Sequence, residues 1–307
     1  MIRDPVLTPA ETRPPEMNFF DRARATAGDR CVTIVLGPLE IQIDGLNEAL
    51  AATLFERYTP YATREAAGNA DALRVRVGLE DVDYFLPPRD GELERVHLAC
   101  DGDRVRYVSY RVAGWFDTQG GQGDLLLGHG DWEPELRAFE NYLRAAVAWQ
   151  AVSRGGALVH AASAVLNGRG YLFYGESGAG KSTLSASNRR GRVVSDDLSL
   201  IVRDGDAMAL VGTPFRGTYE AGDPVEGSFP LRAGFRLIQA ERAEVRDVPR
   251  VRALAELVGN LPFVAEAFGA RPDLFASVQR SFDGVALAHL HFTKDDTYWD
   301  AIAAAGY

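Results

Sequence analysis

The second half of the chain alternates short apolar runs with turn-forming residues. Apolar runs at 157–166, 171–174, 198–203 and 207–212 have the length and the bounding residues typical of strands. Further strands are predicted at 193–197, 235–240 and 285–292, and helices from about 181, near 250–261 and near 272–282. Several strands are separated only by short turns, which favours antiparallel neighbours. The pattern therefore predicts an α/β domain with a mixed rather than purely parallel sheet.

The first half carries a different pattern, which predicts a smaller α+β unit. Strands are predicted at 31–36, 39–43 and 72–79, and a helix at 46–58, where apolar residues recur at helical spacing. Two further alternating runs, 94–100 and 104–112, flank an Asp-Gly-Asp turn and predict a β-hairpin.

The change between the two patterns predicts the domain organisation. A stretch rich in Gly and Gln at 117–124 predicts a loop, and residues 135–154 predict an amphipathic helix that Gly155 and Gly156 end. Residues 1–20 carry four prolines and no apolar periodicity, so we expect an extended arm there. The predicted parts are the arm at 1–20, an N-terminal α+β domain at 21–130 and the α/β domain at 131–307.

Composition narrows the class of partner. The net charge of −10 and the isoelectric point near 5.1 are unusual for a protein that binds a phosphate backbone, so we expect no nucleic-acid partner. No apolar run is long enough to predict a membrane span, and the first residues lack the apolar core of a signal peptide. We therefore expect a cytoplasmic protein without a membrane partner. Cys31 and Cys100 lie far apart without metal-ligand spacing, and we expect reduced, buried thiols.

Lysine is nearly absent from the chain. All but two of the 33 basic residues are Arg, and the two are Lys181 and Lys294. An ammonium is a compact point charge, whereas a guanidinium is a planar fork, so a Lys in such a chain indicates a position that needs the smaller group. Lys181 lies in a glycine-rich segment.

Residues 175–183 have the GxxxxGK[ST] pattern of a phosphate-binding loop, between a predicted strand and a predicted helix. Glycines let the backbone wrap around phosphate oxygens and aim its N–H groups inward. Lys181 would bridge the β- and γ-phosphates, and the Ser182 hydroxyl would bind Mg²⁺. We therefore expect ATP and Mg²⁺ as cofactors. The predicted nucleotide-binding residues are Gly175, Glu176, Ser177, Gly178, Ala179, Gly180, Lys181, Ser182 and Thr183.

Further polar residues suited to this chemistry flank the loop. Asp196 and Asp197 end a predicted strand, at the edge where the ligands of α/β domains lie. Adjacent strand residues point to opposite faces, so we expect one carboxylate near Mg²⁺ and the other near an acceptor hydroxyl. His160 stands in the apolar strand before the loop, a position that by itself is more typical of a core residue. His289 and His291 share one face of the last strand, where a structural role is favoured over metal binding.

Together these features resemble the HPr kinase/phosphorylase superfamily, whose P-loop domain is related to phosphoenolpyruvate carboxykinase. The resemblance rests on an ordered set: His160, then Gly175 fifteen residues later, the GxSGxGKS form of the loop, and a strand ending in two Asp residues. It is strong over about residues 155–203. It implies an HPr kinase-like P-loop domain with a mixed sheet, preceded by a smaller α+β domain, and it suggests a homo-oligomer.

The resemblance also implies a role for each matched residue. Asp196 would accept the proton of a seryl hydroxyl, with His160 assisting it. Lys181 would hold the phosphates, while Ser182 and Asp197 would lie at the metal. Phosphoryl transfer depends mainly on positioning and charge neutralisation, with one group near the acceptor oxygen, and this set supplies both.

The chain departs from the family pattern at specific positions. Thr183 follows the loop where the HPr kinases carry an acid, and the predicted helix after it is short and polar. The family's Glu-x-Arg-Gly-x-Gly stretch, which supplies a metal-binding Glu, is matched only by Arg216 and Gly217, with Pro214 at the acidic position. Arg216 is a candidate contact to substrate or phosphate, and Glu220 is a candidate replacement for the Glu. These departures argue against phosphorolysis and against HPr itself as the substrate.

We therefore expect an ATP- and Mg²⁺-dependent kinase that transfers the γ-phosphoryl group to a Ser or Thr hydroxyl of a peptide or small protein, in peptide biosynthesis or modification. The first domain would select the acceptor. Two alternatives remain. A small-molecule kinase would need only a hydroxyl beside Asp196. A nucleotide-binding regulatory module without transferase activity is favoured by the missing metal-binding Glu, but such a module has no need of the proton-accepting pair His160 and Asp196.

Overall fold

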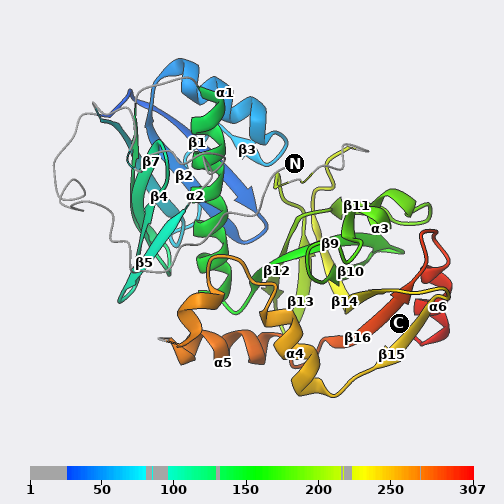
Figure 1. Ribbon diagram of the computed structural model, residues 1–307. Coiled ribbons are helices and arrows are strands. Elements are labelled where there is room, and N and C mark those ends of the chain that lie inside the picture. The colour runs from blue at the N-terminus through cyan, green and yellow to red at the C-terminus, as the bar shows by residue number, and fades with distance from the viewer. Residues whose placement is uncertain are drawn as a thin grey trace. The chain divides into compact units, whose positions relative to one another are not determined.

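The protein folds as two compact units, each built on a large mixed β-sheet (Figure 1). The computed structural model describes residues 26–80, 85, 96–128, 132–215, 217, 223–269 and 271–307. The first unit ends at Gln150 and the second begins at Ala151. This division lies near the end of a long helix, C-terminal to the boundary predicted at 130. The predicted arm at 1–20 lies outside the described residues.

The first unit contains an eight-stranded sheet with the order β3-β1-β2-β4-β8-β7-β6-β5. Its pairs are antiparallel except β2–β4 and β4–β8, which are parallel. The strands are β1 (Arg30–Leu36), β2 (Leu39–Leu46), β3 (Ala62–Thr63), β4 (Leu73–Leu79), β5 (His97–Asp101), β6 (Arg104–Val108), β7 (Val112–Asp117) and β8 (Gly121–Leu127), and the helices are α1 (Glu48–Tyr58) and α2 (Trp132–Ser153).

Helix α2 packs on the sheet of the first unit through its aromatic face. Tyr142 is fully buried and meets the rings of Tyr107 and Phe116 edge to face, with centroids 5.5 Å and 5.6 Å apart. Its hydroxyl donates to the Trp115 carbonyl at 2.9 Å. Because a buried phenol needs a hydrogen-bond partner, this contact fixes the register of the helix on β7. The helix predicted at 135–154 is therefore confirmed.

Two expectations for the first unit are wrong in part. The loop predicted at 117–124 is a strand from Gly121 onward, because β8 is held by ladders to β4 on one side and β7 on the other, and its Gly and Gln residues lack the apolar alternation that announces a strand. The cysteines are not both buried: Cys31 is half-buried and Cys100 is exposed, and neither forms a disulfide. The predicted hairpin is present as β5 and β6.

The second unit contains an eight-stranded sheet with the order β10-β9-β12-β13-β14-β16-β15, with β11 on β9 and a further pairing of β10 with β14. The strands are β9 (Ala157–Leu166), β10 (Arg169–Tyr174), β11 (Arg192–Ser195), β12 (Leu198–Asp204), β13 (Ala207–Val211), β14 (Ser228–Gln239), β15 (Glu244–Asp247) and β16 (Ala286–Phe292). The helices are α3 (Lys181–Ser187), α4 (Arg250–Val258), α5 (Pro272–Ser281) and α6 (Tyr298–Ala304), with a 3-10 turn at Ala265–Gly269.

The central strands β10, β14 and β16 are mutually parallel, whereas their neighbours run antiparallel. The sheet is therefore mixed, as the apolar pattern predicted. Strand β14 joins its two parts: Ser228 to Pro230 pair with β13, and later residues pair with β10 and β16. The sequence predicts this strand only from 235, because the preceding segment carries a proline, an arginine and a glycine.

One face of the central strands forms an apolar core beneath α3 and α6. Phe173 and Phe235 stack at 6.0 Å between centroids, and Leu184 of α3 and Trp299 of α6 complete the cluster. The other face lies against α4. Helices α3, α4 and α5 match the predicted ones. Helix α6 was not predicted, because its seven residues are too few to show a helical period and burial of their aromatic side chains holds them in place.

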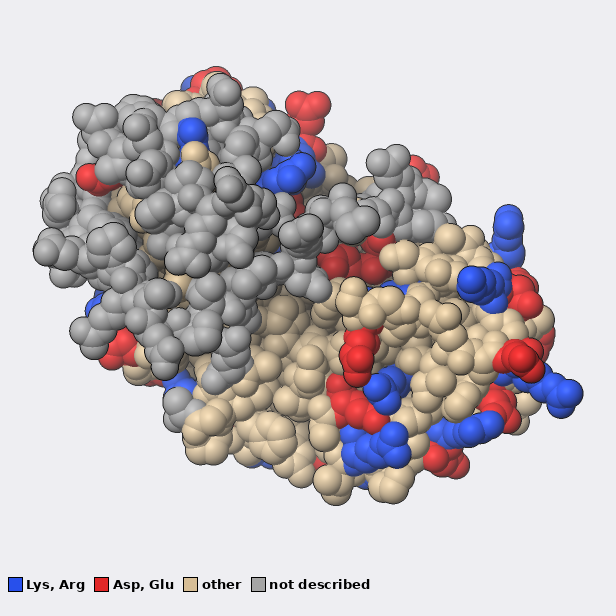
Figure 2. Space-filling model, in the orientation of Figure 1, with Lys and Arg blue, Asp and Glu red and all other residues tan. Residues whose placement is uncertain are grey.

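Among the described residues, no helix has both the length and the apolar character needed to cross a bilayer. On the face of the second unit that Figure 2 shows, basic and acidic side chains are interspersed along the border of the unit. The described residues in this view thus carry charges of both signs rather than one continuous basic surface.

The apolar core makes a specific prediction for stability. Phe235→Ala should lower the free energy of unfolding by about 3–5 kcal/mol, since the side chain is fully buried and leaves a cavity against Phe173. The matched control is Phe275→Ala, because that ring is 41% exposed. Urea unfolding measures both, and equal losses for the two variants would contradict the assignment of this core.

Candidate functional site

The parallel strands of the second unit gather the predicted site residues at one edge of the sheet. The carboxyl ends of β10, β14 and β16 lie at the same edge because the three strands are parallel. Strand β9 runs the other way, with Ala161 opposite Tyr174, so His160 lies at that edge too. Strand β12 begins opposite His160, which brings Asp197 beside it. Ligands of open α/β sheets bind at such an edge.

The predicted phosphate-binding loop connects β10 to α3 at this edge. The helix begins at Lys181, and Gly180 precedes it with a φ of 107°, a conformation that side chains other than glycine rarely adopt. A Cβ atom at Gly180 would lie 2.5 Å from Phe292 Cζ. Glycine at this position therefore meets two independent demands, backbone conformation and close contact with the end of β16.

Lys181 folds back over its own loop. The side chain is largely buried, with 8% of the residue exposed, and its Nζ donates to the carbonyl oxygens of Gly175 at 2.8 Å and Glu176 at 3.4 Å. The next two residues, Ser182 and Thr183, are exposed on the first turn of α3. The loop thus presents one ammonium and two hydroxyls around its opening.

Side chains from β14 hold the loop from outside. Gln239 Nε2 donates to the Gly178 carbonyl at 2.9 Å. Arg236 reaches the Glu176 carboxylate at 3.4 Å through one nitrogen and the Glu256 carboxylate at 3.2 Å through another. No sequence motif predicts these contacts, because they depend on the parallel register between β10 and β14.

Glu256 of α4 is the centre of a charged cluster under the loop. Its carboxylate contacts His289 Nε2 at 2.7 Å and accepts from Arg252 Nε at 2.9 Å, besides Arg236. Burial alone would raise the pKa of Glu256, but the hydrogen bonds from His289 and Arg252 outweigh it and hold that pKa below its ordinary value of 4.5. His289 therefore has the structural contact that the sequence favoured.

Asp196 and Asp197 follow β11, which ends at Ser195, two residues before the predicted end. The pair lies in the bend between β11 and β12, so strand alternation does not orient it. Asp196 is 5% exposed, and its Oδ1 accepts the Gly217 N–H at 2.8 Å. A Cβ atom at Gly217 would lie 2.7 Å from Asp196 Oδ2, so a larger residue there would displace the Asp196 carboxylate. The segment that resembles the family's Arg-Gly stretch thus lies against the Asp pair.

Two of the predicted residues in that segment, Arg216 and Glu220, lie outside the described residues. Their roles as a phosphate contact and a replacement metal ligand stay predictions. Within the described part of the chain, no three His, Cys, Asp or Glu side chains are arranged so that they could hold a metal ion by themselves.

The His160 imidazole lies against the Asp197 carboxylate. The distance from His160 Nε2 to Asp197 Oδ1 is 3.4 Å, and the two side chains are 24% and 18% exposed. The backbone fixes both partners, because His160 N–H donates to the Asn260 carbonyl and Ala161 N–H donates to the Asp197 carbonyl. Strand spacing alone did not predict this contact, and the role expected for His160, to assist Asp196, stays a prediction.

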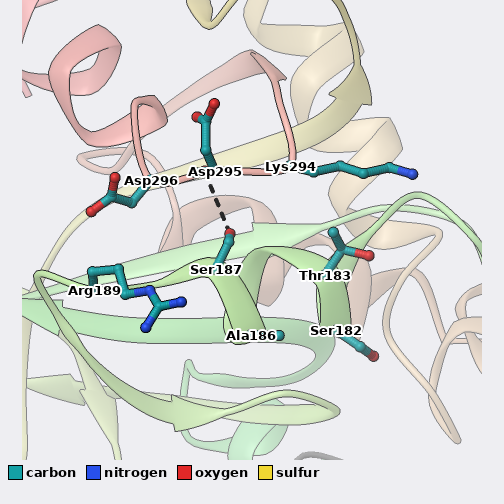
Figure 3. A pocket seen from close by; sticks show the side chains of 8 residues that line it. All are labelled: Ser182, Thr183, Ala186, Ser187, Arg189, Lys294, Asp295 and Asp296. Carbon is teal, nitrogen blue, oxygen red and sulfur yellow. Dashed lines mark hydrogen bonds between the residues drawn. The ribbon is translucent and has the colours of Figure 1, made fainter.

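A groove of about 630 Å³ borders the loop on the exposed side of α3. Figure 3 shows it between the helix residues Ser182, Thr183, Ala186 and Ser187 and the segment 294–296 that follows β16. A smaller cavity of about 80 Å³ shares Thr183 and Lys294 with it. Sequence reasoning gave Lys294 no site, although its rarity was the available signal.

The Glu256 cluster predicts a pH-dependent contribution to stability. Because the pKa of Glu256 is depressed in the folded state, its contribution is fully present above 4.5 and is lost as the pH falls through the depressed value. Glu256→Gln should therefore destabilise the protein at pH 7, and the difference from wild type should shrink on acidification. Urea unfolding from pH 7 to 4 measures this, with the exposed Glu241→Gln as control. A difference that grows on acidification would contradict the assignment.

Comparison with known proteins adds no family to this geometry. The chain matches no protein-family model, and a search of curated proteins gives no significant match.

Proposed function

We propose that the second unit is the catalytic domain of an ATP- and Mg²⁺-dependent kinase that phosphorylates a Ser or Thr hydroxyl of a peptide or small protein. One observation carries the proposal: the loop that opens α3 with Lys181 shares an edge of the sheet with Asp196 and with the His160–Asp197 pair. A phosphate cradle alone supports nucleotide binding. Carboxylates and an imidazole at the same edge add the groups that an acceptor hydroxyl needs.

The loop would bind the phosphates through backbone N–H groups and Lys181. The Lys181 ammonium now donates to two carbonyl oxygens of the loop, at Gly175 and Glu176. Oxygens of the β- and γ-phosphates would replace these carbonyl oxygens as the acceptors. Hydrogen bonds from an ammonium to charged oxygens are stronger than those to neutral ones. Gln239 and Arg236 would keep the loop in shape during this exchange, since they hold it from β14.

The oxygen donors at this edge suit Mg²⁺. This ion prefers hard oxygen ligands, and it is usually held by one or two protein groups together with substrate phosphates and water. The Ser182 hydroxyl and the Asp197 carboxylate would supply the protein's share, which does not require a cage of three protein ligands. Bound there, Mg²⁺ would neutralise charge on the phosphates.

The transfer step needs a proton acceptor beside the hydroxyl. The acceptor oxygen would bond to the γ-phosphorus while the bond to the β–γ bridging oxygen breaks, so that ADP leaves with that electron pair. The hydroxyl proton would pass to Asp196, in agreement with the resemblance to the HPr kinases. Asp196 is held in one orientation by the Gly217 N–H. His160 would act on the neighbouring carboxylate, Asp197, which it contacts in the structure.

The first unit would select the acceptor, because the second unit already contains the groups proposed for nucleotide, metal and proton transfer. A kinase of peptides or small proteins would need the first unit to bind its acceptor. A small-molecule kinase would phosphorylate a free hydroxyl compound at the second unit without such help.

Label transfer from γ-labelled ATP to candidate peptides and small hydroxyl compounds tests the proposal. Lys181→Ala should lower the rate by about 10²–10³-fold, since it removes the charge on the phosphates. Asp196→Asn should lower it by about 10²–10⁴-fold with ATP binding unchanged. Asp197→Asn should raise the Mg²⁺ concentration needed for half-maximal rate. The control is Arg280→Ala, an exposed cation on α5.

The outcomes separate the alternatives. Transfer to small hydroxyl compounds but to no peptide would favour a small-molecule kinase. ATP binding without transfer to any acceptor would favour a regulatory module. If Asp196→Asn transfers label as fast as wild type, our assignment of Asp196 as the proton acceptor is wrong.

A further inference from the structure

The second lysine of the chain lies beside the same helix as the first. Lys294 follows β16 and lines both the large groove and the small cavity, together with Thr183 of α3. Lys181 is the first residue of that helix. In a chain whose other basic residues are all Arg, both lysines therefore lie at one helix, α3, although they are 113 positions apart in the sequence.

The segment that carries Lys294 is held by its own hydrogen bonds. Asp295 Oδ1 accepts from the hydroxyl of Thr293 at 2.7 Å, and the Thr297 N–H donates to the same oxygen at 3.1 Å. Ser187 of α3 donates to the Asp295 carbonyl at 3.4 Å, the contact drawn as a dashed line in Figure 3. The Asp295 carboxylate is thus engaged within its turn, and the turn is attached to the far end of the helix.

The side chains divide the groove into two ends. In Figure 3 the Lys294 side chain extends on the Thr183 side, whereas Asp296 and Arg189 stand at the opposite end. Ala186 contributes only a methyl group to the wall between them and is exposed. The groove therefore has a cation, Lys294, at the Thr183 end and only a methyl group in the middle. Asp296 and Arg189 supply hydrogen-bonding groups at the other end.

We propose that this groove receives the ribose and base of the nucleotide and that Lys294 contacts its α-phosphate. The inference rests on the proposed function, because it extends a nucleotide whose β- and γ-phosphates lie on the loop. The α-phosphate is the next group along the chain of the ligand, and Thr183 and Lys294 are the next side chains along the surface. A volume of about 630 Å³ is in the range of small-molecule sites and exceeds what a nucleoside needs.

The choice of Lys rather than Arg supports this assignment. An α-phosphate presents few unshared oxygens, and a single compact ammonium can approach one of them without the planar space that a guanidinium requires. Lys294 also lines, with Phe292 and Gln239, a cavity of only about 80 Å³. Lys294 thus has the position and the size to contact the α-phosphate, whereas Lys181, folded into the loop, would contact the β- and γ-phosphates.

Equilibrium binding of ATP and of inorganic tripolyphosphate tests the proposal. Tripolyphosphate carries the phosphate chain without ribose or base. Ala186→Trp fills the groove and should weaken ATP binding by at least about tenfold while tripolyphosphate binds within twofold of wild type. Lys294→Ala should weaken both ligands by about tenfold, since both place a third phosphate beside it, and Lys294→Arg should not restore the loss. The control variant is Arg280→Ala, which removes an equal charge from α5.

The two levels of the hypothesis fail in different ways. Wild type that binds neither ligand, or binding that Lys181→Ala leaves intact, would overturn the proposed function. Suppose instead that wild type binds both ligands and that Lys181→Ala weakens both. If Ala186→Trp or Lys294→Ala then binds ATP as tightly as the Arg280→Ala control, the groove is not the nucleoside site, and only the phosphate-binding role of the loop stands. Unchanged tripolyphosphate binding by Ala186→Trp also shows that this variant is folded.

Discussion

The parallel pairing of β10, β14 and β16 is the constraint on which the second unit depends. Parallel strands end at the same edge, so the backbone must turn there three times within a small area. After β10 it forms the glycine-rich loop, the last residue of β14 is Gln239, and β16 ends with Phe292, two residues before Lys294. The contact between Phe292 and Gly180 is a consequence of this register, since a larger residue at 180 would force the loop away from the end of β16. The positions of the loop, of the β14 side chains that hold it and of the groove thus all follow from one pattern of strand pairing.

Charge at this edge is arranged in layers. Beneath the loop, Glu256 is surrounded by His289, Arg236 and Arg252, so its negative charge is balanced within the protein. Lys181, largely buried within the loop, and the exposed Lys294 supply positive charge to the region proposed for phosphates. The acidic net charge of the chain does not oppose anion binding at such a site, because the cations and the backbone N–H groups act over short distances, where screening by salt is weakest.

Most helices and strands of the second unit could be predicted from the sequence, but the contacts between them could not. The loop at 175–183 could be predicted because it is local: glycine conformations, a strand before it and a helix after it are all written in consecutive residues. The partners of that loop could not be predicted, because Gln239, Arg236 and Phe292 reach it only through strand register. The contact between His160 and Asp197 could not be predicted either, since sequence spacing does not record how the side chains of adjacent residues turn. In the first unit, strand β8 escaped prediction because its pairing partners, and not its own composition, make it a strand.

The central claim is that nucleotide phosphates bind inside the loop. Backbone amide chemical shifts measured by NMR during a titration with ATP and Mg²⁺ test it most directly, because they report on the N–H groups that would donate to the phosphates. We expect saturable shifts at Gly178, Gly180 and Lys181 that are larger than those of any amide in the first unit. ATP binding that saturates while these three amides keep their shifts would contradict it.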